Sequence, residues 1–225
     1  MKALRFLALA VLAGFLAKAA PAQAQIEQQQ VVNSALATIE RMKGDDNFQK
    51  SFQPDLARAR AVLLVPSLYK GGFLLGGQYG NGVLIARNPD GGWGYPAFYT
   101  MSGGSFGLQF GLEDVSILFL VMTERGLNAV LSNQFKFGAD LGVTFAVVGA
   151  GMGASTTSSL GADILAFSLG GIGLYGGVSL EGTMLAPRDA WNNAYYGKDV
   201  SSRAIIRERA ISNPDADKLR DVLAH

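Results

Sequence analysis

The sequence predicts an α+β fold, in which a glycine-rich, strongly curved and barrel-like antiparallel β-sheet is flanked by N- and C-terminal helices. Three observations lead to this prediction. All but Gly14, Gly44 and Gly197 of the 29 glycines lie between Gly71 and Gly182. Short segments rich in valine, isoleucine and aromatic residues separate these glycines, and glycine inside a strand marks a bulge, a bend or a close backbone approach. Outside this region the apolar residues recur at helical spacing.

The first 24 residues have the pattern of a secretory signal peptide. Lys2 and Arg5 precede a short apolar run, and Ala22 and Ala24 supply the two small residues that a signal peptidase reads. The apolar run is too short to span the hydrocarbon core of a bilayer, which takes about 20 residues. We therefore expect residues 25–225 to be the mature chain, a single secreted, periplasmic domain.

The composition excludes several function classes. Cysteine is absent and the only histidine is His225, which rules out disulfides, thiol nucleophiles, cysteine metal sites and histidine-based triads. The first 24 residues hold three of the 19 basic residues and none of the 18 acidic ones, so the mature chain would carry 16 basic and 18 acidic residues. A net charge near −2 gives no case for a nucleic acid partner.

The first part of the mature chain, residues 25–60, is predicted to be helical. Apolar residues at helical spacing form one face of an amphipathic helix that ends at Gly44; they are Ile26, Val32, Leu36, Ile39 and Met42. Asp46 and its neighbour Asp45 can cap a short second helix, and Pro54 starts a further turn.

Residues 61–185 form the predicted β-rich core. The run from Ala61 to Val65 is typical of a buried strand, which Pro66 is expected to end. The turn residues at 88–92 predict a hairpin between the strands on either side, and a short helix is expected over 124–134. The strand-like runs are apolar on both faces, whereas the strands of an outer-membrane barrel alternate.

Residues 187–225 return to a helical pattern. Two segments, 188–194 and 201–210, are polar with an apolar stripe, and Pro214 followed by Asp215 opens a last helix. Helices at both ends of a sheet region complete the α+β assignment.

Three carboxylates of the sheet region stand in apolar surroundings: Asp114, Asp140 and Glu181. A facing pair can perform acid–base catalysis, but short acidic side chains also satisfy backbone groups at bulges and turns. Residues 171–176 match the GxGxxG pattern, yet a strand-like segment follows where dinucleotide binding requires a helix. We therefore expect a protein that is not an enzyme and has no cofactor and no metal, with a carboxylate-dependent hydrolase as an alternative.

Basic residues are sparse in the sheet and gather in the N-terminal helices and the first loop. Five of them are predicted to bind lipid: Lys43, Lys50, Arg58, Arg60 and Lys70. Beside the amphipathic helix they can form a surface that lies on anionic lipid, with apolar side chains inserted and amines at head-group level. The alternative is a solvated outer face on a helix that docks on the sheet.

An ordered series of glycine, aromatic and acidic motifs begins at Lys70. It consists of Lys70-Gly71-Gly72-Phe73, Gly76-Gly77, Gly80-Asn81-Gly82, Trp93, Pro96, Gly107-Leu108-Gln109-Phe110-Gly111, Asp114, Gly138-Ala139-Asp140, Gly173-Leu174-Tyr175-Gly176-Gly177-Val178-Ser179-Leu180-Glu181-Gly182, Asn192 and Tyr195-Tyr196-Gly197. Over about residues 35–210 this series closely resembles the SYLF domain, also called the Ysc84 actin-binding domain family. The resemblance implies a lipid-binding module, since eukaryotic members bind phosphoinositides through basic, amphipathic surface near the N-terminal part of the domain, and some bind actin. It also matches Lys70 to the family's lysine before the glycine pair.

The expected function is that of a non-enzymatic, SYLF-type phospholipid-binding domain at a membrane surface of the bacterial envelope. Its expected partner is anionic phospholipid, and it would be peripherally membrane-associated. Actin is found in the eukaryotic cytoplasm, which an exported envelope protein would not enter, so actin is not expected as a partner. The alternative from another class is an envelope structural or assembly protein that binds another protein through strand edges or apolar surface.

Overall fold

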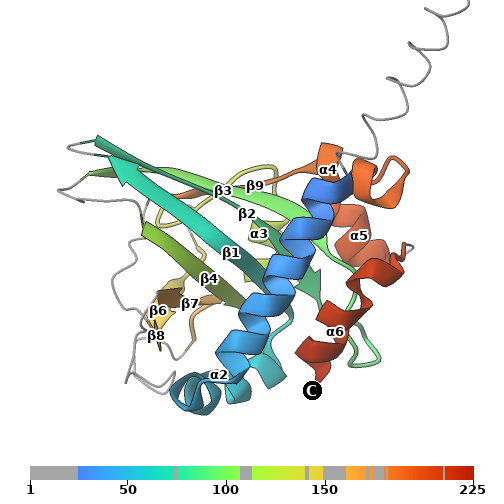
Figure 1. Ribbon diagram of the computed structural model, residues 1–225, viewed down its shortest axis with the longest axis horizontal. Helices are drawn as coiled ribbons and strands as arrows, with labels where there is room; N and C mark the ends of the chain where they lie inside the picture. Colours follow the sequence, from blue (N-terminus) through green and yellow to red (C-terminus); the bar gives the residue numbers. More distant parts are fainter. Residues whose placement is uncertain are drawn as a thin grey trace, which may run out of the picture.

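The computed structural model shows a curled β-sheet with helices packed on its outer side (Figure 1). The structure describes residues 25–72, 75–106, 113–139, 142–148, 161–170, 173–174, 180, 182–209 and 211–225. The predicted signal peptide lies outside the described residues and stays a prediction. Among the described residues, no helix combines the length and hydropathy that a membrane span requires.

The sheet has the strand order β5-β9-β3-β2-β1-β4-β7-β6, and β8 pairs with β7. The strands are β1 (Ala61–Gly72), β2 (Leu75–Ala86), β3 (Ala97–Phe106), β4 (Glu113–Val121), β5 (Phe135–Lys136), β6 (Phe145–Val148), β7 (Ile164–Gly170), β8 (Gly173–Leu174) and β9 (Met184–Pro187). The pairings are antiparallel, as predicted, except that β6 runs parallel to β7. The predicted hairpin is β2 and β3, which Arg87 and Trp93 extend by an isolated bridge.

The helices flank this sheet at both ends of the chain, as predicted. They are residues 25–43, which we call the N-terminal helix, α2 (Asp46–Arg58), α3 (Glu124–Val130), α4 (Asp189–Tyr196), α5 (Ser202–Glu208), the 3-10 turn η1 (Pro214–Ala216) and α6 (Asp217–Ala224). The short second helix and the further turn predicted to start at Pro54 form one continuous helix, because Pro54 lies inside α2. Phe52 and Leu56, one turn apart, are both buried in the same cluster, so the helix continues through the proline.

The sheet buries side chains on both faces, as its doubly apolar strands predict. In β1, Ala61, Leu63 and Val65 point to the inner cluster, and Val62 and Leu64 point to the outer one. The inner cluster also contains residues of α3 and α5, and the outer cluster is completed by the N-terminal helix, α2, α4 and α6. The domain therefore has two hydrophobic layers with the sheet between them.

Aromatic contacts draw the two ends of the sheet together on its inner side. Phe137, which follows β5, stacks on Phe119 of β4 at a ring-centroid distance of 5.2 Å. The same ring meets Phe145 of β6 edge-on at 5.6 Å. Because β5 and β6 are the opposite ends of the strand order, these contacts show that the sheet is strongly curled and barrel-like.

Strand β1 does not end at Pro66, contrary to the prediction. The pairing register with β2 shifts between Leu64 and Ser67, which marks a bulge, and a bulge is a position where a strand tolerates proline. The extra residue also changes which side chains face inward, so that Val65 and Leu68 both lie in the inner cluster. The bulge places Tyr69 on the outer face, where it is exposed.

Candidate functional site: an arginine pocket

Five arginines line one pocket of about 420 Å³ at the end of the sheet where β1 begins. We call it the arginine pocket, and its arginines are Arg58, Arg60, Arg87, Arg207 and Arg209. One carboxylate, that of Glu124, is among the lining residues. The lining therefore has a strong excess of positive charge, and guanidinium groups are well suited to bind phosphate or carboxylate oxygens.

Antiparallel pairing brings the first three arginines together. Arg58 ends α2, and Arg60 directly precedes β1. Ala61 pairs with Ala86 in β2, so Arg87 follows β2 beside Arg60, and its backbone amide donates to the Arg60 carbonyl oxygen at 2.7 Å.

Helix α5 supplies the other two arginines from a distant part of the sequence. Ile205 and Ile206 of α5 are buried in the inner cluster, and this anchors the helix beside the sheet. Arg207 lies in the last turn, and Arg209 is the C-cap in the left-handed region with φ 57°. The Arg209 guanidinium donates a long hydrogen bond, 3.4 Å, to the carbonyl oxygen of Arg87.

Arg87 holds the floor of the pocket in place. Its guanidinium donates to the carbonyl oxygens of Leu56 at 2.8 Å and Ala59 at 3.1 Å, at the end of α2, and lies 4.3 Å from the ring centroid of Trp93. Cations at a helix C-terminus are stabilised by its free carbonyl groups. Burial lowers the pKa of Arg87, which nevertheless stays charged because guanidinium pKa values lie above about 12.

Glu124 links two of the arginines across the pocket. Its carboxylate forms ion pairs with Arg207 and, at 3.5 Å, with Arg60. The hydrogen bond from Arg207 is the main cause that lowers the pKa of Glu124, helped by the charges of both arginines and opposed by burial. A single carboxylate is thus shared by two guanidinium groups, which leaves the pocket with unneutralised positive charge.

The five predicted lipid-binding residues do not form one cluster. Arg58 and Arg60 line the arginine pocket, whereas the Lys43 amine donates to the carbonyl oxygen of Val222 in α6. Burial lowers the pKa of Lys43. Lys43 therefore caps α6 rather than joining the two arginines.

Lys50 and Lys70 are described only in their backbone. Lys70 lies ten residues after Arg60 along β1 and pairs with Gln78. Since a strand rises about 3.3 Å per residue, Lys70 and Arg60 are separated by about 30 Å. Whether Lys50 or Lys70 contacts lipid stays a prediction.

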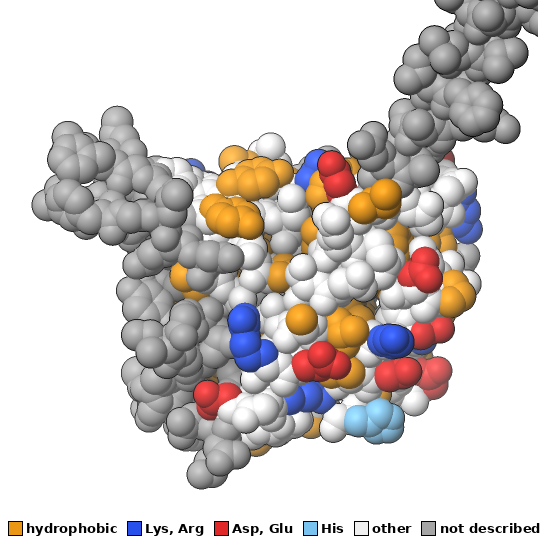
Figure 2. All heavy atoms as spheres, in the orientation of Figure 1, with side chains coloured by type: hydrophobic (Ala, Val, Ile, Leu, Met, Phe, Trp, Pro, Cys, Tyr) orange, Lys and Arg blue, Asp and Glu red, His pale blue; other side chains and the backbone are white. Residues whose placement is uncertain are grey.

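The amphipathic face of the N-terminal helix is not available for insertion into lipid. Val32, Ile39 and Met42 are at most 2% exposed and pack in the outer cluster. Of the apolar residues on this face, Ile26 remains exposed. The helix is thus docked on the sheet, whereas lipid binding by the neighbouring basic residues stays a prediction. On the helix-covered face, Figure 2 shows described basic side chains close to acidic ones, not gathered in one patch.

The sequence did not indicate Arg87, Arg207 or Arg209 as site residues. The local pattern places Arg87 at the end of a strand. It places Arg207 and Arg209 on the polar side of a helix, more than 100 residues after Arg87. No local spacing relates them to Arg60. The signal lies in the strand register and the docking of α5, which are tertiary features.

The catalytic alternative is not tested by the structure. Asp140 and Glu181 lie outside the described residues, and the side chain of Asp114 is not described. Among the residues that are described, no three acidic or histidine side chains gather into a group that could hold a metal ion.

Comparison with known proteins finds a matching family and several curated relatives. Residues 102–225 match the family Ysc84, described as "Las17-binding protein actin regulator". The chain is 30% identical over 173 residues to LAS seventeen-binding protein 3 of Saccharomyces cerevisiae, covering 76% of this chain and 38% of that protein. It is 30% identical over 170 residues to Protein YSC84 of the same organism, covering 75% and 36%.

A human relative extends the similarity beyond yeast. The chain is 26% identical over 169 residues to SH3 domain-containing YSC84-like protein 1 of Homo sapiens, covering 75% of this chain and 49% of the human protein. The chain thus spans less than half the length of each of these three curated relatives.

Proposed function

This chain belongs to the Ysc84 family, and on that premise we propose that it is a non-enzymatic module that binds anionic phospholipid head groups at a membrane surface through the arginine pocket. One observation carries the proposal: five arginines at the ends of α2, β2 and α5 and just before β1 converge on a pocket with a single lining carboxylate. Phosphate oxygens accept several guanidinium hydrogen bonds at once, which makes arginine the preferred residue for such recognition.

The arginines differ in how closely the protein itself engages their guanidinium groups. Arg87 is engaged by three backbone carbonyls, and Arg58 pairs with the buried Asp55. Arg60 and Arg209 are exposed, and their guanidinium groups make long contacts, of 3.5 Å to Glu124 and 3.4 Å to the carbonyl oxygen of Arg87. We infer that these two guanidinium groups bind the head-group phosphate, while Arg87 positions the floor.

The proposed ligand follows from the predicted leader. Export would place the pocket in the bacterial envelope, where phosphatidylglycerol is an anionic lipid with an accessible phosphate. We propose a peripheral attachment there. The family's description names Las17 binding and actin regulation, and one yeast relative is named for Las17 binding; the proposal for this chain does not require either.

Vesicle binding tests the proposal. The double variant Arg60→Gln/Arg209→Gln should bind phosphatidylcholine vesicles containing phosphatidylglycerol about 30-fold more weakly than the unmodified chain, because each basic residue near an anionic surface contributes about 1 kcal/mol. Binding should also weaken with added salt, since exposed charges are screened. Co-sedimentation over a range of lipid concentrations measures both effects.

The matched control is Lys198→Gln/Lys218→Gln, which removes two charges from exposed positions outside the lining of the pocket. It should bind nearly as tightly as the unmodified chain. Two results would contradict the proposal: no binding of the unmodified chain at low salt, or equal weakening by both double variants.

A further inference from the structure

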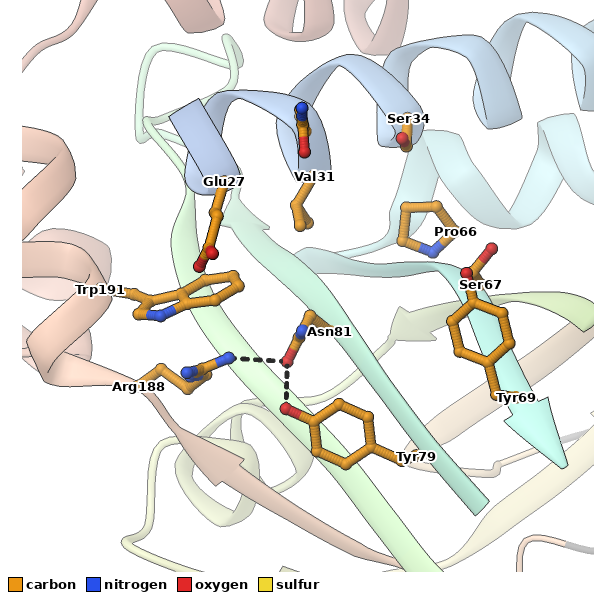
Figure 3. Close-up of a pocket in the computed structure, with 11 residues that line it drawn as sticks. Glu27, Val31, Ser34, Pro66, Ser67, Tyr69, Tyr79, Asn81, Arg188 and Trp191 are labelled. Carbon is orange, nitrogen blue, oxygen red and sulfur yellow. Dashed lines mark hydrogen bonds between the residues drawn. The ribbon is translucent and has the colours of Figure 1, made fainter. Parts of the chain in front are cut away.

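A second pocket, of about 550 Å³, lies on the helix-covered face of the sheet (Figure 3). The first turns of the N-terminal helix form one wall, β1 and β2 form the floor, and the start of α4 closes one end. We call it the aromatic groove. The lining residues that matter here are Glu27, Pro66, Tyr69, Tyr79, Arg188 and Trp191. None of them lines the arginine pocket.

The groove collects apolar side chains that the fold leaves exposed. Tyr69 of β1 and Tyr79 of β2 are directly opposite in the strand register and are 58% and 48% exposed. They are two of the three large hydrophobic side chains that are exposed in the described part of the chain; the third, Ile26, is not among the residues that line the groove. Exposed apolar residues that gather in one place mark a binding surface.

The two tyrosine rings leave space between them. Cross-strand neighbours have Cβ atoms about 5 Å apart, yet Figure 3 shows the rings of Tyr69 and Tyr79 standing apart, on either side of the open groove. Pro66, at the bulge of β1, lies above Tyr69 in the same view. The groove thus offers the aromatic rings of Tyr69, Tyr79 and Trp191 and the ring of Pro66 among polar lining side chains.

A hydrogen-bond network fixes the closed end of the groove. The Arg188 guanidinium lies 3.5 Å from the ring centroid of Trp191 and donates to Asn81 Oδ1 at 3.0 Å. The Tyr79 hydroxyl donates to the same oxygen at 3.2 Å. Arg188 is therefore held by the protein itself and sets the position of the Trp191 ring.

The charges of the groove nearly cancel. Arg188 is the only cation among its lining residues, and Glu27 is the only anion. Glu27 is exposed and forms no ion pair with any described residue. A neutral groove gives an anionic head group no advantage, and the Arg188 guanidinium on Trp191 disfavours a cation in that place. The balance favours a ligand that is uncharged along most of its length and carries a single basic group near Glu27.

We propose that the aromatic groove binds a proline-rich, extended segment of a partner protein, with a basic residue of that segment facing Glu27. A polyproline II helix makes no internal hydrogen bonds, so its carbonyl groups are free to accept from hydroxyl donors. Its proline rings fit between aromatic side chains, and it loses little conformational entropy on binding. Tyrosine and tryptophan supply this combination of apolar ring and polar edge.

Fluorescence anisotropy with a defined probe tests this inference. The probe is a fluorescein-labelled decaproline with one terminal arginine, and the control is a glycine–serine peptide of the same length with the same arginine. The unmodified chain should bind decaproline and not the control peptide. Tyr69→Ala/Tyr79→Ala should weaken binding at least tenfold, because truncation of buried aromatic anchors dominates interface energies.

Three further variants sharpen the test. Tyr69→Phe keeps the ring and should retain binding within a few-fold. Glu27→Gln should weaken binding of the arginine-bearing probe more than that of decaproline without arginine. Arg60→Gln/Arg209→Gln, the variant of the arginine pocket, should bind decaproline normally, so a failure of the lipid proposal leaves this result unchanged.

The unmodified chain decides the proposal without any variant. Failure to bind decaproline at millimolar concentration would overturn it. Binding of the control peptide with equal affinity would do the same, as would displacement of the probe by the glycan chitotetraose or by phosphatidylglycerol vesicles. The last two results would assign the groove to a glycan or to a lipid.

Discussion

Asp163 is the most heavily bonded acidic side chain in the described part of the protein, and it is completely buried. Arg125 donates to both of its carboxylate oxygens, at 2.8 and 3.1 Å. Thr123 donates its hydroxyl, and Thr144 donates its backbone amide at 2.8 Å and its hydroxyl at 3.1 Å. One side chain thus joins the start of α3 to the segments before β6 and β7.

The stability of the protein should therefore fall in acid. Burial raises the pKa of Asp163, but the hydrogen bonds from Arg125, Thr123 and Thr144 outweigh burial and lower it to about 2, against 3.8 for an ordinary aspartate. Because the folded state has the lower pKa, the ionised group stabilises it fully above about pH 4, and this contribution is lost as the pH falls to 2. The difference corresponds to about 2 kcal/mol at neutral pH.

Urea denaturation between pH 2 and pH 6 measures this effect. Asp163→Asn should be less stable at pH 6 and should lose less stability than the unmodified chain below pH 4. Asp221→Asn, at an exposed position of α6, should follow the unmodified chain. Parallel acid curves for Asp163→Asn and the unmodified chain would show that Asp163 does not carry the pH dependence.

At the scale of elements, the bulge of β1 explains why β2 contains glycine. At Gly82 an added Cβ would lie 2.3 Å from the carbonyl oxygen of Leu64 and 2.9 Å from a methyl group of Val65. Neither the backbone of the bulge nor the packed valine can move far. At Gly77, five residues earlier in the same strand, an added Cβ would meet nothing within 4 Å.

Alanine substitutions in β2 should distinguish a glycine that the packing requires, Gly82, from one that it does not, Gly77. Gly82→Ala should lower the free energy of unfolding by more than about 2 kcal/mol, because the core would have to accept an atom for which there is no space. Gly77→Ala should change it by less than about 0.5 kcal/mol, or raise it slightly by restricting the unfolded chain. Thermal unfolding of both variants gives the comparison, and similar melting temperatures would contradict the explanation.

At the scale of the whole molecule, the two proposed binding sites lie near opposite ends of β1. Arg60 precedes β1, and Tyr69 stands near its other end, nine residues away. At about 3.3 Å per residue this distance is about 30 Å. A protein attached to a membrane through the arginine pocket would therefore have its aromatic groove well away from the bound phosphate, free to bind a second partner.

The outer layer of helices should unfold together with the sheet in one cooperative transition. Ile39 of the N-terminal helix is fully buried against the outer face of the sheet. Ile39→Ala should cost about 2–5 kcal/mol and should shift the unfolding of the whole domain in one transition. Glu40→Ala, at the neighbouring exposed position, should leave stability nearly unchanged.

Circular dichroism and tryptophan fluorescence can follow this transition together. Trp93 lies in the outer cluster and its indole nitrogen donates to the carbonyl oxygen of Leu223, so fluorescence reports on the helical layer. If Ile39→Ala lowered the melting temperature seen by fluorescence and left that of the sheet, seen by circular dichroism, unchanged, the helix would be an independent unit.

Much of the fold could be predicted from local patterns. The period of the apolar residues indicated the helices at both ends, and the doubly apolar strands indicated a sheet covered on both sides. The hairpin of β2 and β3 followed from the turn residues between them. The structure departs from the prediction at Pro54 and Pro66, where burial of Phe52 and Leu56 in one case, and a bulge in the other, allowed the element to continue.

The candidate site could be predicted only in part. Arg58 and Arg60 were identified because they are close in sequence, and Lys43 was grouped with them for the same reason. The structure separates them, since Lys43 caps α6 while Arg58 and Arg60 turn towards α5. Arg207 and Arg209 were missed because their proximity to Arg60 depends on contacts between residues nearly 150 positions apart.

By itself, the sequence determined the α+β class, the order of the elements and the family resemblance, because propensity, period and motif order are properties of neighbouring residues. Only the tertiary structure decided which charges meet and which aromatic side chains stay exposed. The register of β1 with β2 sets Arg60 beside Arg87 and Tyr69 opposite Tyr79. Such proximity arises from long-range pairing and burial, which no local pattern encodes.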